Sequence, residues 1–494
     1  MEHLSTELND LPDEILMIIL KKLFNTEVLY SLIDVNKRFN TIVRDPIFTN
    51  KLTLMRCLSN NRNYPLPDPI LDRFCFQILP SIRHKIKWLN LESSSMKRIL
   101  NVTNYPNLYG LGLYDLEIET ARSLIDEFCL TSINKNQILS LIIDVTKYKN
   151  GKNLRRDMTE CIFMHILNIF SNLEYLNFCP SSMWYQGLLL NNPSPTINSS
   201  TLLELHISLA SLTDCLYILD GRFNKLHTLY VDIDFISSLR LTNNNQEKLS
   251  NLRCFSLCCG MSTDYYDELI VPFLQRMSNL EKLSLNLIVC AKSKFVDGIE
   301  LKQNIINHMA RLKRLEFCIS SSISLRNQIY LQSKQDIQDT FKDFKDDEII
   351  SYVDYFQEKY TRCHIYLYPE QLKYYGTLTN NFPGENSKPQ NNKLCRESQN
   401  GIQDFAIINY PYLTTLTLYG AHDDYIEEFL VDTKICLPNN LLHINIYYEQ
   451  LKRVTHNFTR DATRNNCAKL NSLFLNGRRY PKHAKNYFPN VPKY

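Results

Sequence analysis

The sequence beyond residue 80 repeats one short pattern of hydrophobic and polar positions. Each copy has hydrophobic residues at its first, fourth and sixth positions. The fourth and sixth residues lie on one face of a short strand, because successive strand side chains point to opposite faces. The pattern therefore predicts a series of strands that each bury one face. Its twelve copies are IKWLNL (from Ile86), LYGLGL (Leu108), ILSLII (Ile138), LEYLNF (Leu173), LLELHI (Leu202), LHTLYV (Leu226), LRCFSL (Leu252), LEKLSL (Leu280), LKRLEF (Leu312), LTTLTL (Leu413), LLHINI (Leu441) and LNSLFL (Leu470).

The spacing of the copies predicts a helix between consecutive strands. The copies start 22 to 35 residues apart, except for one interval of 101 residues between Leu312 and Leu413. The segments between them have helical spacing, most clearly residues 160–173 and 265–280. A strand and a helix repeating at this length are similar to a leucine-rich repeat, in which stacked units bury one another's hydrophobic faces. The copies lack the regular Asn of typical repeats and vary in length, so the resemblance is to irregular leucine-rich repeats.

We expect the repeats to form one continuous core from about Ile86 to Leu475, with Leu283 buried near its centre. A generic α/β protein with leucine-rich strands is the alternative. The long interval has a different pattern. Residues 332–360 are charged and predict a helix, and HIYLY (His364–Tyr368) is a degenerate strand candidate. Residues 376–401 are polar and rich in Pro, Gly, Asn and Ser, which predicts a loop projecting from the repeats.

Ten residues near the start, Leu11 to Leu20, combine a helix start with an unbroken hydrophobic run. Pro12 suits the first helical position, where its missing N–H costs nothing. Asp13 and Glu14 follow in the first turn, where carboxylates stabilise the positive end of a helix. The next six residues are all hydrophobic, which requires hydrophobic neighbours on more than one side. The run is too short to span a membrane, so we interpret it as part of a small helical unit that packs on itself and on a second protein.

The residues around this run form a composite pattern. They are LNDLPDEILMIILKKL (Leu8–Leu23), Leu29, Leu32, VNKRF (Val35–Phe39), Ile42 and DPIF (Asp45–Phe48). The segment from Leu8 to about Leu54 resembles an F-box, which places Leu-Pro-x-Glu first, then a Val-Cys-Lys-x-Trp-like stretch, then an aromatic residue. Here Asn36 stands where Cys is common, and Phe39 and Phe48 stand where Trp is common. An ordinary N-terminal helical hairpin is the alternative.

This resemblance implies an adaptor rather than an enzyme. In the family, the F-box binds the Skp-type adaptor of a Skp–cullin–F-box ubiquitin ligase, and C-terminal repeats hold a protein substrate. Such a chain acts by proximity, because it raises the local concentration of the substrate near a ubiquitin-charged enzyme. A leucine-rich-repeat interaction scaffold without ligase function is the alternative. The resemblance assigns the adaptor-facing positions to Leu11, Pro12, Ile15, Leu16 and Ile19, and the positions that hold the helical unit together to Leu20, Leu23, Leu32 and Val35.

The expected fold class is α/β, with an all-helical F-box followed by an irregular leucine-rich-repeat solenoid whose parallel strands line the concave side and whose helices line the convex side. The expected organisation is an F-box at 1–60, a linker and first helix of the repeats at 61–82, the N-terminal part of the solenoid at 83–330, a degenerate repeat with the charged helix and the loop at 331–404, and the C-terminal part of the solenoid at 405–494.

The alternation of strand side chains also predicts a substrate-binding face. The third, fifth and seventh residues of each copy point away from the core. Exposed aromatic residues and Arg dominate the energetics of protein interfaces, although they can also simply cover a curved surface. The predicted residues are Trp88, Tyr114, Tyr175, His206, Tyr230, Asp232, Arg314, Glu316, Tyr419 and Tyr447.

Composition and charge narrow the function further. The 494 residues include 55 basic and 52 acidic ones, and this near balance does not favour nucleic acid or an anionic membrane as partner. The odd number of cysteines, 15, at irregular spacing, favours reduced thiols in the cytoplasm or nucleus. We find no catalytic or metal-binding motif in the sequence and expect no cofactor. The basic residues 147–156 are expected to form an exposed loop rather than a phosphate site.

Overall fold

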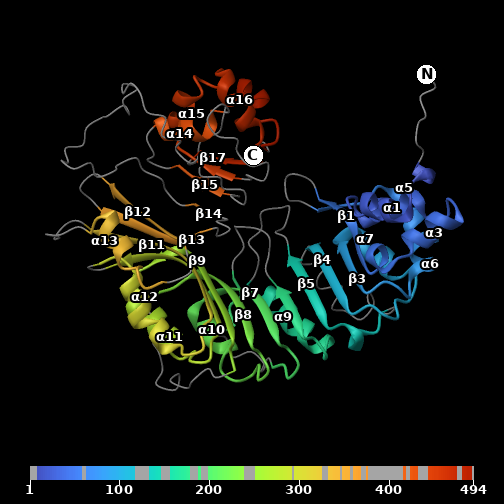
Figure 1. The fold of residues 1–494 in the computed structure, drawn as a ribbon, viewed down its shortest axis with the longest axis horizontal. Coiled ribbons are helices and arrows are strands. Elements are labelled where there is room, and N and C mark those ends of the chain that lie inside the picture. Colours follow the sequence, from blue (N-terminus) through green and yellow to red (C-terminus); the bar gives the residue numbers. More distant parts are fainter. Residues whose placement is uncertain are drawn as a thin grey trace. The chain divides into compact units, whose positions relative to one another are not determined.

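The structure, a computed structural model, is a mixed α/β fold built on a large, mostly parallel sheet (Figure 1). The sheet has 13 strands in the order β12-β13-β11-β10-β9-β8-β7-β6-β5-β4-β3-β1-β2, and a second sheet has four in the order β14-β15-β16-β17. The residues that the structure describes are 8–57, 63–116, 133–145, 156–178, 187–190, 198–237, 251–291, 294–324, 332–344, 348–356, 360–368, 374–375, 415–418, 423–431, 443–475 and 481–491.

The chain begins with short helices whose ends follow local sequence signals. Pro12 directly precedes α1, Asn36 caps α3 by accepting a hydrogen bond from the Phe39 backbone N–H at 2.8 Å, and Asp45 caps α4 by accepting one from the Ile47 N–H at 2.9 Å. The helices are η1 (Leu8–Asp10), α1 (Asp13–Leu20), α2 (Asn25–Leu32), α3 (Lys37–Val43) and α4 (Pro46–Thr49).

The first nine copies of the repeated pattern form parallel strands of the large sheet, as predicted. Pairing places each fourth-position residue opposite the fourth-position residue of the next copy, in the order Leu89, Leu111, Leu141, Leu176, Leu205, Leu229 and Phe255. Each of these side chains is at most 2% exposed. The strands are β3 (Trp88–Glu92), β4 (Gly110–Leu116), β5 (Ser140–Val145), β6 (Tyr175–Phe178), β7 (Glu204–Ser211), β8 (Thr228–Phe235), β9 (Cys254–Thr263), β10 (Lys282–Ala291) and β11 (Arg314–Ser324).

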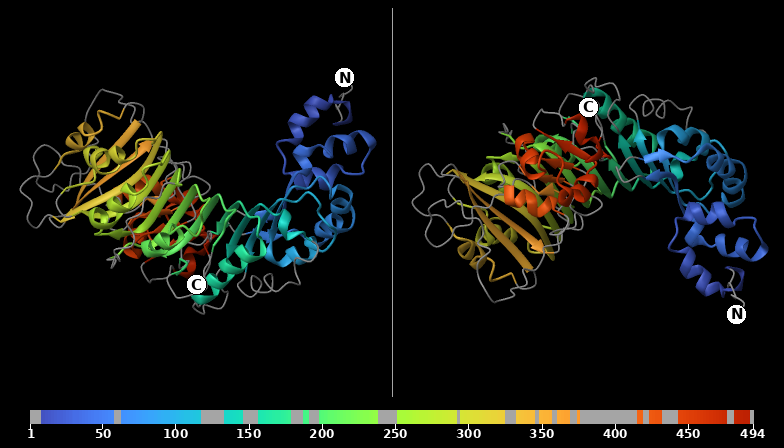
Figure 2. Two further views of the ribbon diagram at one scale, coloured as in Figure 1. Left: turned by 90° about the horizontal axis from the view of Figure 1, so that it is seen from below. Right: turned by 90° about the horizontal axis from the view of Figure 1, so that it is seen from above.

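Helices connect many of these strands, as the spacing predicted. The helix expected at 160–173 is α9, and the one expected at 265–280 is the pair η4 and α11. Helices α7 and α10 pack on the strands beside them, and α9 lies along the same sheet (Figure 2). The helices are α5 (Asp68–Arg73), η2 (Phe74–Ile78), α6 (Leu79–Ile82), α7 (Ser93–Leu100), η3 (Lys135–Gln137), α9 (Arg156–Ile169), α10 (Leu212–Ile218), η4 (Tyr266–Ile270), α11 (Val271–Gln275), α12 (Gly298–Asn304), η5 (Ile306–His308) and α13 (Lys334–Asp339).

The sheet starts earlier in the chain than the repeats indicated. Strand β1 (Lys51–Cys57) pairs in parallel with β3, and β2 (Asn63–Pro65) pairs antiparallel with β1. Leu52 and Leu54 of β1 are fully buried, opposite Leu89 and Leu91. The residues directly after α4 therefore belong to the sheet.

The charged segment after β11 is only partly helical, so the prediction of a helix over residues 332–360 is wrong. Helix α13 ends at Asp339, and β12 (Glu348–Phe356) and β13 (Tyr360–Tyr368) pair antiparallel. The residues of β12, EIISYVDYF, are rich in β-branched and aromatic side chains, which favour strands. The strand predicted at His364–Tyr368 lies within β13, which pairs antiparallel with β11. The loop predicted at 376–401 lies outside the described residues.

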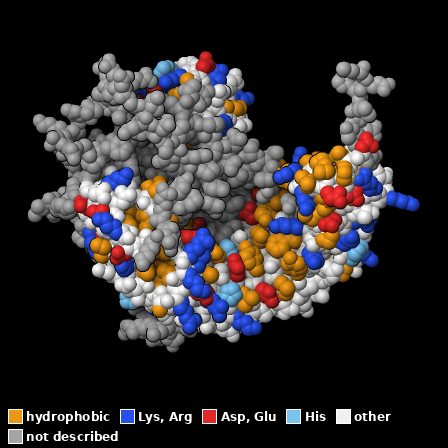
Figure 3. All heavy atoms as spheres, viewed as in Figure 1, with side chains coloured by type: hydrophobic (Ala, Val, Ile, Leu, Met, Phe, Trp, Pro, Cys, Tyr) orange, Lys and Arg blue, Asp and Glu red, His pale blue; other side chains and the backbone are white. Residues whose placement is uncertain are grey.

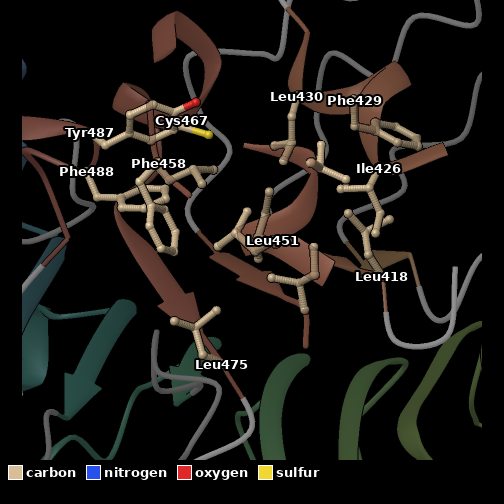
Figure 4. Packing of buried hydrophobic residues seen from close by; sticks show 14 of the residues in the cluster. Leu418, Ile426, Phe429, Leu430, Leu451, Phe458, Cys467, Leu475, Tyr487 and Phe488 are labelled. Carbon is tan, nitrogen blue, oxygen red and sulfur yellow. The ribbon is translucent and has the colours of Figure 1, made fainter. Parts of the chain in front are cut away.

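The last three copies form a sheet of their own, so the prediction of one continuous core to Leu475 is wrong. In this sheet Leu416, Ile444 and Leu473 lie opposite one another. Its core extends past the last copy, because Ala484, Tyr487, Phe488 and Val491 pack with the buried strand residues (Figure 4). Its elements are β14 (Tyr374–Tyr375), β15 (Thr415–Thr417), α14 (Asp423–Leu430), β16 (His443–Asn445), α15 (Tyr448–Val454), α16 (Asp461–Ala468), β17 (Ser472–Phe474) and η7 (Lys482–Asn486).

The chain divides into two compact units. The first contains residues 1–58, 62–258 and 276–281, and the second contains 59–61, 259–275 and 282–494. The N-terminal helices therefore belong to the same unit as strands β1 to β8. None of the helices in the described part of the chain is long and hydrophobic enough to cross a membrane.

Leu283 tests the energetic weight of the fourth position. Its side chain is fully buried in β10, as predicted, opposite Leu315. Truncation removes buried methyl groups and leaves a cavity, so Leu283→Ala should lower the free energy of unfolding by ~2–5 kcal/mol. Denaturant unfolding measures the loss. The exposed Asn286 of the same strand is the control, and Asn286→Ala should change stability by no more than about 0.5 kcal/mol. An equal effect of the two substitutions would contradict the repeat assignment.

Candidate interaction surfaces

The hydrophobic run of α1 has one buried side and one exposed side. Leu16 and Leu20 are buried at 0% and 3% exposure, whereas Ile15, Ile18 and Ile19 are 43%, 57% and 40% exposed. This division follows helical spacing, because residues three and four apart share a face. Hydrophobic side chains gather over the N-terminal helices in the space-filling view (Figure 3). We call the exposed group, Pro12, Ile15, Ile18 and Ile19, the α1 surface.

The adaptor-facing positions assigned by resemblance fall into two groups. Pro12, Ile15 and Ile19 are exposed, and Leu11 is half-buried. Leu16 is fully buried beneath them and packs inside the helical unit. Ile18 was not assigned, although its spacing from Ile15 places it on the same side of the helix.

The residues assigned to hold the helical unit together are also divided. Leu20 is buried and Leu32 is half-buried. Leu23 and Val35 are 48% and 57% exposed, so their assignment to the interior is wrong. Leu23 follows the end of α1, and Val35 lies in the turn before α3, where neither faces the packed side of a helix.

The α1 surface is held in place by contacts to α3. Arg38 forms an ion pair with Asp13 at 2.7 Å and donates a hydrogen bond to the Leu11 carbonyl oxygen. These contacts fix the residues that lead into α1. The start of the helix is therefore tied to the helical unit at its polar edge, while its hydrophobic side stays exposed.

The helical unit is joined to the sheet by polar and aromatic contacts. The Asn25 side-chain amide donates to the carbonyl oxygens of Ile47 and Lys51, at 3.1 and 3.0 Å, and so connects α2 to the start of β1. Tyr30 of α2 stacks on Phe74, with the ring centroids 6.4 Å apart, and the Arg73 guanidinium lies 4.8 Å from the Tyr30 ring. The helices and the first strands therefore pack as one body.

A second candidate surface lies on the side of strands β3–β8 that faces away from the buried ladder. We call it the polar face; it is formed by the third, fifth and seventh residues of the copies. Two glycines shape one part of it, because a Cβ at Gly110 would collide with the Trp88 ring, and one at Gly112 would collide with Asn90 and Tyr114. The Trp88 ring therefore packs against the β4 backbone at Gly110. Its indole N–H donates to the Asn90 side chain at 2.7 Å.

Three rings from neighbouring strands form another part of the polar face. His206 stacks on Tyr230, with the centroids 4.2 Å apart and the planes 11° apart, and Tyr175 lies 5.4 Å from His206 on the other side. The imidazole Nε2 of His206 lies 2.7 Å from a Glu204 carboxylate oxygen. All three rings are half-buried, so each offers part of its surface.

Carboxylates follow these rings along the strands. The alternation of strand side chains places four carboxylates on the same side of the sheet as the rings: Glu92, Asp144, Asp232 and Asp234. Glu92 accepts hydrogen bonds from the Ser94 N–H and hydroxyl at 2.9 and 2.7 Å. Asp232 keeps an exposed side chain, although desolvation, and then the charge of Asp234, raises the pKa of its carboxyl.

Asp115 adds a carboxylate at an irregular point of the sheet. Its φ is 53°, and the pairing of β4 with β5 shifts register between Leu113 and Leu116. Its carboxylate accepts a hydrogen bond from the Asn63 backbone N–H at 2.9 Å. Burial, together with the charges of Asp144 and Glu92, raises the pKa of Asp115. The ends of β3, β4 and β5 thus bring negative charges close enough to repel one another.

The remaining predicted substrate-face residues that the structure describes belong to β11 and to the second sheet. Arg314 and Glu316 form an ion pair at 2.7 Å on β11, and Lys282 reaches the same carboxylate at 3.1 Å. Tyr447 is 42% exposed beside α15 in the second sheet. Tyr419 lies outside the described residues. Among the predicted residues that the structure describes, it thus brings Tyr175, His206 and Tyr230 into ring contact and pairs Arg314 with Glu316.

Three polar-face residues were not predicted, although the strand alternation identifies their positions. Glu204, Asn90 and Asp144 occupy third, fifth and seventh positions, and only the preference for aromatic residues and Arg left them out. Lys51, whose ammonium lies 5.4 Å from the Trp88 ring, was missed because β1 was not recognised as a strand.

Comparison with known proteins adds no family assignment. The chain matches no protein-family model, and no curated protein matches it. Within the described ranges, no group of three or more His, Cys, Asp or Glu side chains is arranged to hold a metal ion. The candidate sites among the described residues are the α1 surface and the polar face.

Asp115→Asn should stabilise the protein at neutral pH. The raised pKa means that the folded state disfavours the ionised carboxyl of Asp115. This penalty disappears at a pH low enough to protonate the carboxyl in both the folded and the unfolded state. Asn keeps the hydrogen-bond acceptor for Asn63 and tolerates the positive φ. We expect a gain of less than about 1 kcal/mol near pH 7 that vanishes near pH ~3.

Thermal unfolding across this pH range measures the effect, and Asp339→Asn is the control. Hydrogen bonds from Gln335 and Lys342 lower the pKa of Asp339, so its neutralisation should not stabilise the fold. A gain at Asp115 that persists at low pH would show that the ionised carboxylate, disfavoured first by burial and then by nearby charges, is not its cause.

Proposed function

We propose that this chain is a non-catalytic adaptor of a Skp–cullin–F-box ubiquitin ligase. In this role the N-terminal helices are an F-box that binds the Skp-type adaptor, and the repeated strands and helices are an irregular leucine-rich-repeat solenoid that binds a protein substrate. The chain would act in the cytoplasm or nucleus.

One observation carries the proposal: the exposed isoleucines of α1. Isolated hydrophobic side chains are common on protein surfaces, but a contiguous group is typical of an interaction site. Ile15, Ile18 and Ile19 form such a group on a helix whose other side is packed, and the sequence around them has the Leu-Pro-x-Glu start of the F-box pattern. The proposal explains why only two residues of this six-residue hydrophobic run, Leu16 and Leu20, are buried in the core.

The attachment of the helices to the sheet supports the second part of the proposal. An adaptor that works by proximity gains most when its two binding surfaces are held at a defined separation, since effective concentration depends on the geometry of the connection. Asn25 attaches α2 to β1 and Tyr30 attaches it to η2, and α4 is followed by β1 without a flexible linker. A substrate held on the strands would then keep a fixed distance from the adaptor.

Replacing two isoleucines of the α1 surface tests the proposal. The double variant Ile15→Asp, Ile19→Asp places charges in the centre of the proposed interface, where loss of a central contact costs about 2 kcal/mol or more. We expect binding of purified Skp-type adaptor to weaken by more than about tenfold. Titration calorimetry measures the affinity, and an unchanged melting temperature verifies that the variant is folded.

The matched control is Phe76→Asp, which changes a 76% exposed hydrophobic residue of η2 outside the α1 surface and should bind normally. Adaptor binding at the wild-type level by the folded double variant would refute the F-box assignment. Co-purification of a cullin with the wild-type chain separates the ligase adaptor from the alternative, a repeat scaffold without ligase function, because only the former assembles with the cullin through the adaptor.

A further inference from the structure

We propose that the polar face of β3–β8 binds a Lys- and Arg-rich segment of the partner protein. This inference deepens the proposed function, on which it rests, by naming the chemical class of the substrate segment. It is argued from the charge of the six strands and from the placement of their rings.

The six strands are negatively charged, unlike the chain as a whole. Within their bounds the sequence has six carboxylates and no Lys or Arg, whereas the full chain has 55 basic and 52 acidic residues. Strand alternation places five of the six on the polar face, where Glu92 and Asp144 are buried, Glu204 and Asp234 are half-buried, and Asp232 is exposed. The carboxylates are Glu92, Asp115, Asp144, Glu204, Asp232 and Asp234. Surfaces of one sign attract partners of the opposite sign and fix how they dock.

The carboxylates are close enough to repel one another. The charges of Asp144 and Glu92 both act to raise the pKa of Asp115, and Asp234 acts in the same way on Asp232. Glu92 and Asp144 are buried, so a cationic side chain of a partner would relieve this repulsion at the exposed Asp232 and the half-buried Asp234. The exposed Asp232 is the member most directly available to it.

The rings supply a second contact for the same cations. Lys and Arg bind favourably over the faces of Trp and Tyr rings, and Trp88 of the polar face already makes one such contact, with the ammonium of Lys51 on the neighbouring strand β1 at 5.4 Å. Tyr230 and Tyr175 flank His206, and Glu204 lies beside it. A guanidinium of the partner at this point would contact a ring and a carboxylate together. An extended basic segment could make such contacts with several of its side chains.

Other occupants fit less well. The phosphates of nucleic acid would be repelled by the strand carboxylates. A divalent ion needs several ligands around one point, and the part of the chain that the structure describes offers no such group. A basic protein segment satisfies both the charge and the rings.

Binding of a fluorescein-labelled octa-arginine peptide to the full chain tests the inference. Fluorescence anisotropy near physiological salt should show that octa-arginine binds the chain more tightly than labelled octa-glutamate does. The isosteric double variant Glu204→Gln, Asp232→Asn should weaken arginine binding about five-fold or more, since it removes two charges on β7 and β8, the strands that carry His206 and Tyr230. The control, Glu449→Gln with Asp461→Asn, removes the same charge from exposed positions on α15 and α16 and should weaken it less than about two-fold.

Equal losses in the two double variants would show that attraction is only to overall charge and would overturn the inference. So would octa-arginine binding no tighter than octa-glutamate. The Ile15→Asp, Ile19→Asp variant separates this inference from the proposed function. It should bind octa-arginine normally, and the Glu204→Gln, Asp232→Asn variant should bind the Skp-type adaptor normally. If the wild-type chain binds the Skp-type adaptor normally but binds octa-arginine no more tightly than octa-glutamate, only the basic-segment inference is rejected.

Discussion

The register between neighbouring strands is the constraint on which the other features depend. Each fourth-position residue lies opposite the next, from Leu89 to Phe255, and this ladder is buried throughout. A shift of one residue in any strand would exchange its two faces. It would expose Leu205 or Leu229 and force His206 or Tyr230 into the core. The same ladder that stabilises the sheet therefore also determines which side chains meet on the polar face.

The junction at β1 connects that ladder to the N-terminal helices. The chain passes from α4 directly into a strand whose Leu52 and Leu54 are buried with the repeats. The hydrogen bonds from Asn25 fix α2 to this junction. The α1 surface and the polar face consequently belong to one compact unit. This arrangement suits a chain that brings two other proteins together, because neither surface needs to move for both to be occupied.

The strands could be predicted from sequence because their buried positions obey a simple alternation. The same alternation placed Tyr175, His206 and Tyr230 on one face, and the structure shows that their rings are in contact. The end of the large sheet could not be predicted in this way. Strand β12 has charged neighbours as well as β-branched residues, so its sequence alone is ambiguous, and its strand structure depends on pairing with β13. Leu16 shows a similar limit, because a hydrophobic run does not reveal which of its residues will be covered.

Hydrogen exchange of the full chain with and without purified Skp-type adaptor tests the central proposal most directly. It reports where the adaptor binds without any change to the sequence. We expect slower exchange in peptides that cover residues 11–24, which include the α1 surface, and unchanged exchange in those that cover strands β3–β8. No protection at α1 at saturating adaptor, or protection confined to the strands, would contradict the assignment of the N-terminal helices as the adaptor-binding unit.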